Sequence, residues 1–136
     1  MSTAKTVEEW FEVALQRAND AEAMIKLEQS NGPVYMAGWV LECSLNGYLQ
    51  RKGISRPTRR PGEASHDLVR LWKKAGFKMG DLADKTGQKS WLLSSWGTHL
   101  RYDAERHIPF TNEELIRAAK SLNSFIKNRL PNKKRG

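Results

Sequence analysis

The segment Val34-Tyr-Met-Ala-Gly-Trp-Val-Leu41 decides whether this chain builds helices or strands. It is a continuous apolar run, and such runs occur both in buried strands and in buried helices. Its length and its flanking residues favour a helix from about Pro33 to Lys52, with proline in the first turn and Gly53 as the C-cap. The small residues of this helix would let another helix approach closely; they are Ala37, Gly38, Ser44 and Gly47.

Two further helices are predicted to begin at capping boxes, which are Thr6 with Glu9 and Thr111 with Glu114. The first carries an apolar stripe at helical spacing and is predicted to run to about residue 29. The last is predicted over residues 112–129, and Pro131 ends it.

The region between the second and the last of these helices predicts one more main helix and one or two short ones. Ser65 can cap a third helix that has Asp67 in its first turn and ends at Gly76. A turn of helix is expected within residues 79–85 and a further short helix over residues 91–102. Because no alternating strand pattern occurs, we predict an all-α, up-down helical bundle of four main helices plus one or two short helices. Residues 1–130 would form a single domain, followed by a basic tail at residues 131–136.

The composition is that expected of a soluble cytoplasmic protein. The chain has 136 residues, which suffices for one core without disulfides. Its single cysteine, Cys43, lies among apolar residues and is expected to be a buried, unreactive thiol. No apolar run approaches the length of a membrane span, and the N-terminus lacks the apolar core of a signal peptide.

The net charge of +8 is unevenly distributed along the chain. Residues 1–31 hold three Lys/Arg and six Asp/Glu, whereas the remaining residues hold twenty and nine. A basic surface attracts phosphate backbones and also acidic proteins, although the same charge can serve solubility alone. The five tryptophans supply large apolar area, and some of them are candidates for a subunit interface.

The segment Arg101-Tyr-Asp-Ala-Glu-Arg-His107 contains the residues best suited to phosphodiester chemistry. A guanidinium can stabilise charge on a phosphate, and an imidazole can transfer a proton. Six residue steps turn a helix by about 240° net, so the chain must leave the helix before Arg101 and His107 can meet one phosphate. In the structural alternative, Arg101 pairs with a carboxylate such as Glu42 and His107 is an exposed loop residue.

Three segments together resemble the HEPN family of small helical bundles. They are Tyr35-Met-Ala-Gly-Trp-Val-Leu-Glu-Cys-Ser-Leu-Asn-Gly-Tyr-Leu49, Ser65-His-Asp-Leu68 and the segment from Arg101 to His107. In that family an alanine-rich second helix carries a glutamate, His-Asp-Leu opens the third helix, and an arginine-containing segment precedes the last. The resemblance covers residues 7–130.

The resemblance implies an RNA-directed protein, and in its catalytic form a metal-independent endoribonuclease of toxin or defence type. In active members an arginine and a histidine with four to six residues between them cut RNA, with the 2′-hydroxyl as nucleophile and two copies of the motif meeting across a homodimer. Arg101 and His107 match this spacing. Tyr102 and the pair Ile108-Pro109 depart from the flanking pattern. They resemble instead a branch associated with nucleotidyltransferases, which implies a non-catalytic module that binds a nucleotidyltransferase partner or a nucleotide.

His66 and the basic loop are further candidates. His66 could line the cleft with Arg101, or it could be a hydrogen-bonded residue at a helix start whose neighbour Asp67 serves the helix dipole. The basic residues at the end of the second helix and in the loop after it are candidate RNA contacts, or else a solvated loop. They are Arg51, Lys52, Arg56, Arg59 and Arg60. His99 has no partner at metal-ligand spacing, so we predict no metal site and no cofactor.

Overall fold

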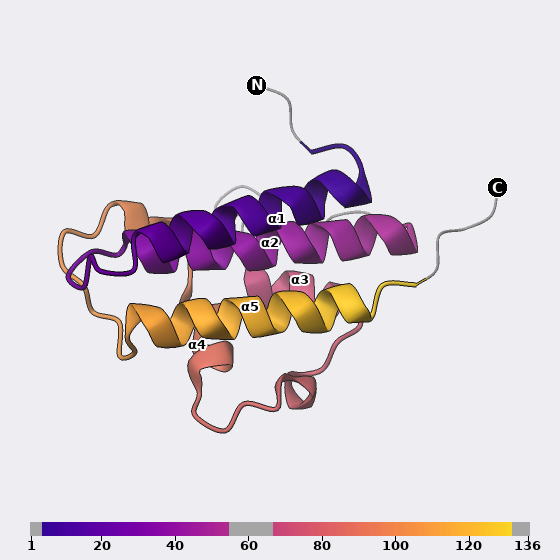
Figure 1. The fold of residues 1–136 in the computed structure, drawn as a ribbon. Coiled ribbons are helices and arrows are strands. Elements are labelled where there is room, and N and C mark those ends of the chain that lie inside the picture. Colours follow the sequence, from indigo (N-terminus) through magenta and orange to yellow (C-terminus); the bar gives the residue numbers. More distant parts are fainter. Residues whose placement is uncertain (1–3, 55–66, 132–136) are drawn as a thin grey trace.

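The computed structural model of the chain describes residues 4–54 and 67–131, in which every regular element is a helix (Figure 1). The predicted all-α class is therefore confirmed for this part of the chain. Three long helices form the body, and two short α-helices and two turns of 3₁₀ helix lie between the second and third long helix. The elements are α1 (Val7–Ala23), α2 (Gly32–Lys52), α3 (Leu68–Lys74), η1 (Met79–Leu82), α4 (Gln88–Ser95), η2 (Thr98–Arg101) and α5 (Asn112–Asn128).

α1 begins at the predicted cap, where the Thr6 side chain accepts a hydrogen bond from the Glu9 backbone N–H. It ends earlier than predicted, at Ala23 instead of about residue 29. The physical reason lies far away in the sequence, because the Asn112 amide donates to the carbonyl oxygens of Ile25 and Leu27. A backbone carbonyl oxygen that accepts a hydrogen bond from a distant side chain does not need the N–H group of a continuing helix as its donor.

α2 is the central helix, and residues 40–49 are all buried. It ends at Gly53, whose φ of 72° is the left-handed conformation expected of a glycine C-cap. The predicted small-residue face is confirmed at two positions. A methyl group at Gly47 would lie 2.8 Å from the Phe11 ring of α1, and one at Gly38 would meet the Trp96 indole.

The middle of the chain is more broken than the sequence predicts. α3 begins at Leu68 with Asp67 itself as the N-cap, accepting from the Arg70 backbone N–H, and is only seven residues long. Ser65, the predicted cap, lies outside the described residues. The single helix predicted over residues 91–102 is divided into α4 and η2, because the chain is extended at Trp96 and Gly97.

α5 runs beside α2 and in the same direction (Figure 1). Its capping box at Thr111 and Glu114 forms as predicted. The Ser44 hydroxyl lies 2.6 Å from the Asn123 amide oxygen, and an Arg51 Nη donates to the Pro131 carbonyl at 3.1 Å. These two bonds join the C-terminal half of α2 to the parallel helix α5 and to Pro131 just after it. The third main helix that the sequence predicts is the short α3. None of the helices in the described residues is both long and apolar enough to cross a membrane.

Candidate nucleic-acid interface

The position of Arg101 follows from how the chain leaves α4. Trp96 takes an extended conformation, with φ −67° and ψ 143°, and its indole packs directly over Gly38 of α2. The indole Nε1 donates to the Tyr35 carbonyl at 3.1 Å, which pins the end of α4 to the start of α2. η2 then begins at Thr98 and ends at Arg101. A buried tryptophan thereby sets the place of an exposed arginine.

Three aromatic rings from two distant segments pack together beneath Arg101. The Tyr35 and Trp96 rings are stacked, with centroids 5.9 Å apart and an interplanar angle of 21°. Trp39 meets both edge-on, at 5.9 Å from Tyr35 and 5.7 Å from Trp96. Offset stacks and edge-to-face pairs are the favoured aromatic geometries. This cluster gives the surface above it a rigid base.

Arg101 lies between two tyrosines on that base. Its guanidinium carbon is 5.8 Å from the Tyr35 ring centroid and 5.1 Å from that of Tyr102, which are cation–π distances. One Nη also donates to the Tyr102 hydroxyl at 3.2 Å. Both side chains are exposed, and Tyr102 retains 78% of its accessible surface.

The structural alternative for Arg101, an ion pair with a carboxylate such as Glu42, does not form. Among the described residues Arg101 has no carboxylate partner. Glu42 is 2% exposed, inside α2, whereas Arg101 is on the surface. Most of the five guanidinium N–H donors are therefore available to a ligand.

His107 lies on the loop that follows η2 and makes no recorded contact with Arg101. Its Nε2 is 3.4 Å from a carboxylate oxygen of Glu105, and both side chains are about four-fifths exposed. The chain does leave the helix after Arg101, as the six-step spacing requires. The structure thus places the two candidate catalytic residues on neighbouring exposed segments, with no hydrogen bond between their side chains.

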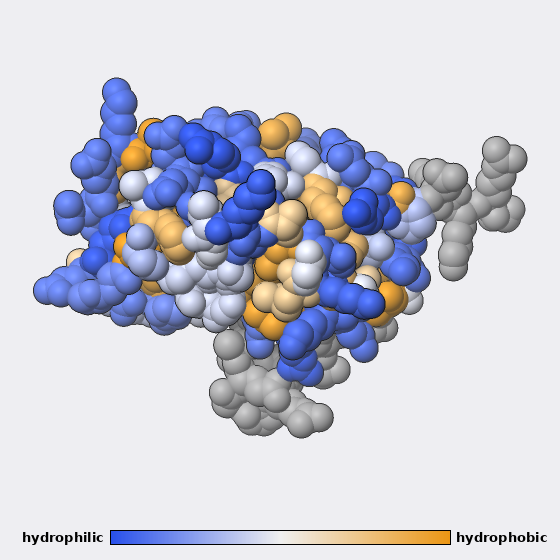
Figure 2. All heavy atoms as spheres, turned by 90° about the horizontal axis from the view of Figure 1, so that it is seen from below, coloured by the Kyte–Doolittle hydropathy of each residue, from blue (hydrophilic) through white to orange (hydrophobic). Residues whose placement is uncertain are grey.

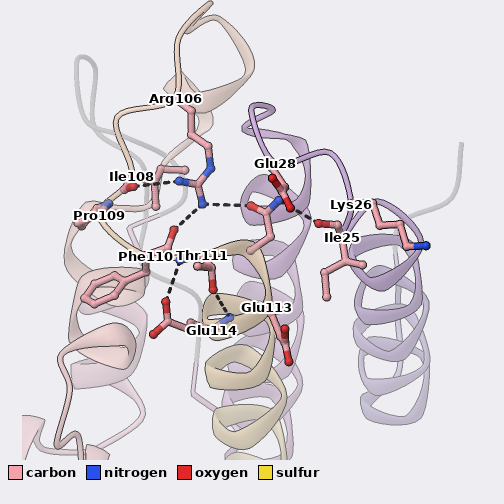
Figure 3. A pocket seen from close by; sticks show the side chains of 11 residues that line it. Ile25, Lys26, Glu28, Arg106, Ile108, Pro109, Phe110, Thr111, Glu113 and Glu114 are labelled. Carbon is pink, nitrogen blue, oxygen red and sulfur yellow. Dashed lines mark hydrogen bonds between the residues drawn. The ribbon is translucent and has the colours of Figure 1, made fainter.

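The loop between them is held by the buried Asn31 and the partly buried Arg106. The Asn31 amide donates to the carbonyl oxygens of Asp103 and Glu105, both at 3.2 Å. Arg106 points inward, where its guanidinium donates to the carbonyl oxygens of Ile108 and Phe110 and to the Asn112 amide oxygen (Figure 3). Burial lowers the pKa of Arg106. Sequence reasoning did not single out Arg106, whose role here is to shape the loop.

A hollow of about 640 Å³ opens beside Arg106, between the turn after α1 and the start of α5 (Figure 3). Its charged lining consists of Lys26, Glu28, Arg106, Glu113 and Glu114. Three carboxylates against two cations make this hollow a poor site for a phosphate. Glu114 is also committed to the α5 cap, since the Thr111 backbone N–H and hydroxyl lower the pKa of its carboxyl.

The second predicted interface, the basic loop, is described only where it leaves α2. Arg51 is engaged on the protein itself, because its guanidinium contacts Glu8 at 3.4 Å and the Pro131 carbonyl at 3.1 Å. Lys52 is exposed, with its Nζ 5.7 Å from the Tyr48 ring centroid. Arg56, Arg59, Arg60 and His66 lie outside the described residues.

The two candidate interfaces lie at opposite ends of α2. Tyr35 and Arg51 are sixteen residues apart, which is about 24 Å along a helix. The residues that sequence reasoning missed at the first interface are Tyr35, Trp39 and Trp96. The available signal was the i, i+4 spacing of Tyr35 and Trp39 around Gly38, which places two rings on one helical face beside a gap.

No group of three or more potential metal ligands occurs in the part of the chain that the structure describes. Comparison of the chain with protein-family models, with curated proteins and with solved structures finds no match.

Proposed function

We propose that this chain is a HEPN-like, RNA-directed protein that binds RNA through Arg101. The observation that carries the proposal is an exposed guanidinium held between two tyrosine rings, with most of its donors free and no carboxylate partner among the described residues. An arginine so held matches phosphate geometry at little entropic cost, because its planar group is already oriented. The excess of Lys/Arg after residue 31 adds long-range attraction for a polyanion.

The catalytic form of the proposal is a metal-independent endoribonuclease. The 2′-hydroxyl of RNA would attack the adjacent phosphorus while a proton leaves that hydroxyl, and the bond to the 5′-oxygen would break as that oxygen gains a proton. The products would be a cyclic 2′,3′-phosphate and a 5′-hydroxyl. His107 would serve in proton transfer and Arg101 would stabilise the phosphate charge. A homodimer would bring two copies of the segment together.

A second candidate is a non-catalytic module that binds a nucleotidyltransferase partner or a nucleotide. The observation that favours it is the exposed His107, which pairs with Glu105 and does not contact Arg101. In this form the Arg101–Tyr102 surface would bind without chemistry. Cleavage of RNA separates the catalytic form from the non-catalytic form. The affinity for RNA tests whether Arg101 is the RNA contact on which the proposal depends.

The experiment measures binding and cleavage of mixed-sequence RNA by the purified chain in the presence of a chelator. We expect Arg101→Ala to weaken binding by about tenfold, as for loss of a charged hydrogen-bonding group. The matched control is Arg117→Ala, which removes another exposed arginine that is already paired with Glu113 at 2.9 Å. Equal losses from both variants would show that Arg101 contributes only bulk charge and would contradict the proposal.

Cleavage is read from the same samples. The catalytic form predicts fragments with cyclic phosphate ends that disappear in the Arg101→Ala, His107→Ala double variant. Sedimentation over the same concentrations tests the homodimer. RNA that stays intact while Arg101→Ala weakens its binding would leave the non-catalytic form standing.

A further inference from the structure

Four side chains at the Arg101 interface follow one another pairwise from the core to the surface, and we call this series the column. Trp96, only 5% exposed, stacks on Tyr35, whose ring meets the Arg101 guanidinium, and the guanidinium in turn lies against Tyr102. Two aromatic rings are followed by one guanidinium and a third aromatic ring, and each step is within 6 Å. The column ends in a ring that is 78% exposed.

An exposed tyrosine that is held in place differs from the other exposed large hydrophobic side chains, which are Leu15, Leu27 and Met79. The Tyr102 ring is fixed on one side by Arg101, through its face and through its hydroxyl. Among the described residues no other side chain is recorded against this ring. A planar group of similar size would extend the column without displacing anything.

We propose that Tyr102 is a stacking site for one unpaired RNA base, while Arg101 holds an adjacent phosphate. This inference rests on the proposed RNA binding and specifies the form of RNA that the site takes. Every base has a π-face, and stacking on aromatic side chains is how proteins hold single strands without reading a fixed sequence. In a duplex both faces of each base are covered by neighbouring bases, so a duplex offers this ring nothing to stack on.

The charge of the site favours RNA over a protein partner. A tyrosine with an arginine also occurs in protein interfaces, where a buried arginine needs a carboxylate from the other chain. A single RNA strand supplies a base for the tyrosine ring and an anionic group for the arginine together, because a phosphate lies next to every base. Purines, with their larger rings, should stack more strongly than pyrimidines.

The experiment compares three probes of equal length by fluorescence anisotropy. They are a single-stranded RNA, the same RNA paired with its complement, and a strand of the same phosphates whose central nucleotides lack bases. We expect the single strand to bind about tenfold more tightly than the abasic strand, since one stacked base accounts for roughly that factor. We expect the duplex to bind no better than the abasic strand.

Variants at position 102 assign this difference to one ring. Tyr102→Leu should lose about tenfold in affinity for the single strand and nothing for the abasic strand. Tyr102→Phe keeps the ring but not the bond to Arg101, and should lose less than Tyr102→Leu. The control is Leu27→Ala, at a side chain that is 52% exposed and lies outside the site; it should bind as the unmodified chain does.

The outcomes separate this inference from the proposal beneath it. If the chain binds RNA in an Arg101-dependent way but binds the abasic strand or the duplex as well as the single strand, the stacking site is wrong and the RNA function stands. A Tyr102→Leu variant that keeps full affinity for the single strand has the same meaning. If none of the three probes binds, both proposals fail. The competing explanation is then that the site binds a protein partner, which predicts that Tyr102→Leu weakens binding of that partner.

Discussion

Gly38 decides how closely the segment that carries Arg101 approaches α2. The Trp96 indole lies where a side chain at position 38 would be, so only a glycine allows the tryptophan to reach the Tyr35 carbonyl. Glycine inside a helix costs about 1 kcal/mol relative to alanine, and here close packing of a large aromatic ring offsets that cost. A single residue therefore links helix packing to the geometry of the interface.

Replacing Gly38 with alanine should lower the free energy of unfolding by about 1–3 kcal/mol, the usual cost of overpacking a core. The new methyl group would lie 1.9 Å from Trp96 Cε2, so the indole must move. Urea denaturation measures the loss. Gly80→Ala is the matched control, because no atom lies within 4 Å of the added methyl group there. A Gly38→Ala variant as stable as the unmodified chain would contradict the close approach of α4 to α2.

At the scale of elements, α4 is held at its first turn by a side chain that precedes it. Its N-cap position is Gly87, which has no side chain to offer. Asp84 instead accepts the backbone N–H groups of Gly87, Lys89 and Ser90 and the Ser90 hydroxyl, at 2.6–3.2 Å. Burial raises the pKa of the Asp84 carboxyl, but these hydrogen bonds outweigh burial and lower it below its ordinary 3.8.

The pH dependence of stability follows from the sign of that shift. A group whose pKa is lower in the folded state contributes stability above its unfolded pKa and loses it as pH falls through the folded pKa. Asp84→Asn should therefore cost about 1 kcal/mol near neutral pH, as for a lost cap. It should also make stability fall less steeply below about pH 4. Urea titrations between pH 7 and 3 measure both, with the exposed Asp103→Asn as a charge control. An unchanged acid slope in Asp84→Asn would rule out this role.

The starts of α1 and α5 and the glycine cap of α2 were predictable because their determinants are local. Thr6 and Thr111 each accept from a backbone N–H three residues on, and Gly53 follows the helix it closes. The end of α1 and the break at Trp96 were not predictable, because each depends on a contact across more than sixty residues. The same limit applies to the candidate site. Sequence spacing proposed Arg101, but two of the packed rings, Tyr35 and Trp39, come from α2, and Trp96 comes from the end of α4.

At the scale of the whole molecule, the candidate contacts among the described residues are exposed basic side chains and not a continuous apolar surface. The exposed large hydrophobic side chains lie on separate elements, at Leu15, Leu27, Met79 and Tyr102. On the face seen from below, hydrophobic patches are interrupted by hydrophilic side chains (Figure 2). The exposed basic residues that we consider, in contrast, lie near both ends of α2, with Arg101 at one end and Lys52 at the other. A long polyanion could engage both ends, whereas a short one could engage only one.

Separation of the two ends predicts that RNA length decides which arginines matter. Replacing Arg56, Arg59 and Arg60 with alanine should weaken binding of a 16-nucleotide RNA and reduce the slope of log affinity against log salt by about 2, at roughly 0.7 per phosphate contact. The same triple variant should bind a 4-nucleotide RNA nearly as well as the unmodified chain. Four nucleotides are near the short limit of known site sizes. A strand of that length held at Arg101 does not reach the far end of α2, which is about 24 Å away.

Arg101→Ala is the matched comparison, and it should weaken binding of both RNA lengths. Combining Arg101→Ala with the triple variant should give additive losses in the free energy of binding for the long strand, as expected of independent sites. Equal effects of the triple variant on both lengths would show that the loop and Arg101 act as one site. An unchanged affinity and slope for the long strand would return the basic loop to a solvated role and leave the Arg101–Tyr102 surface as the proposed RNA contact.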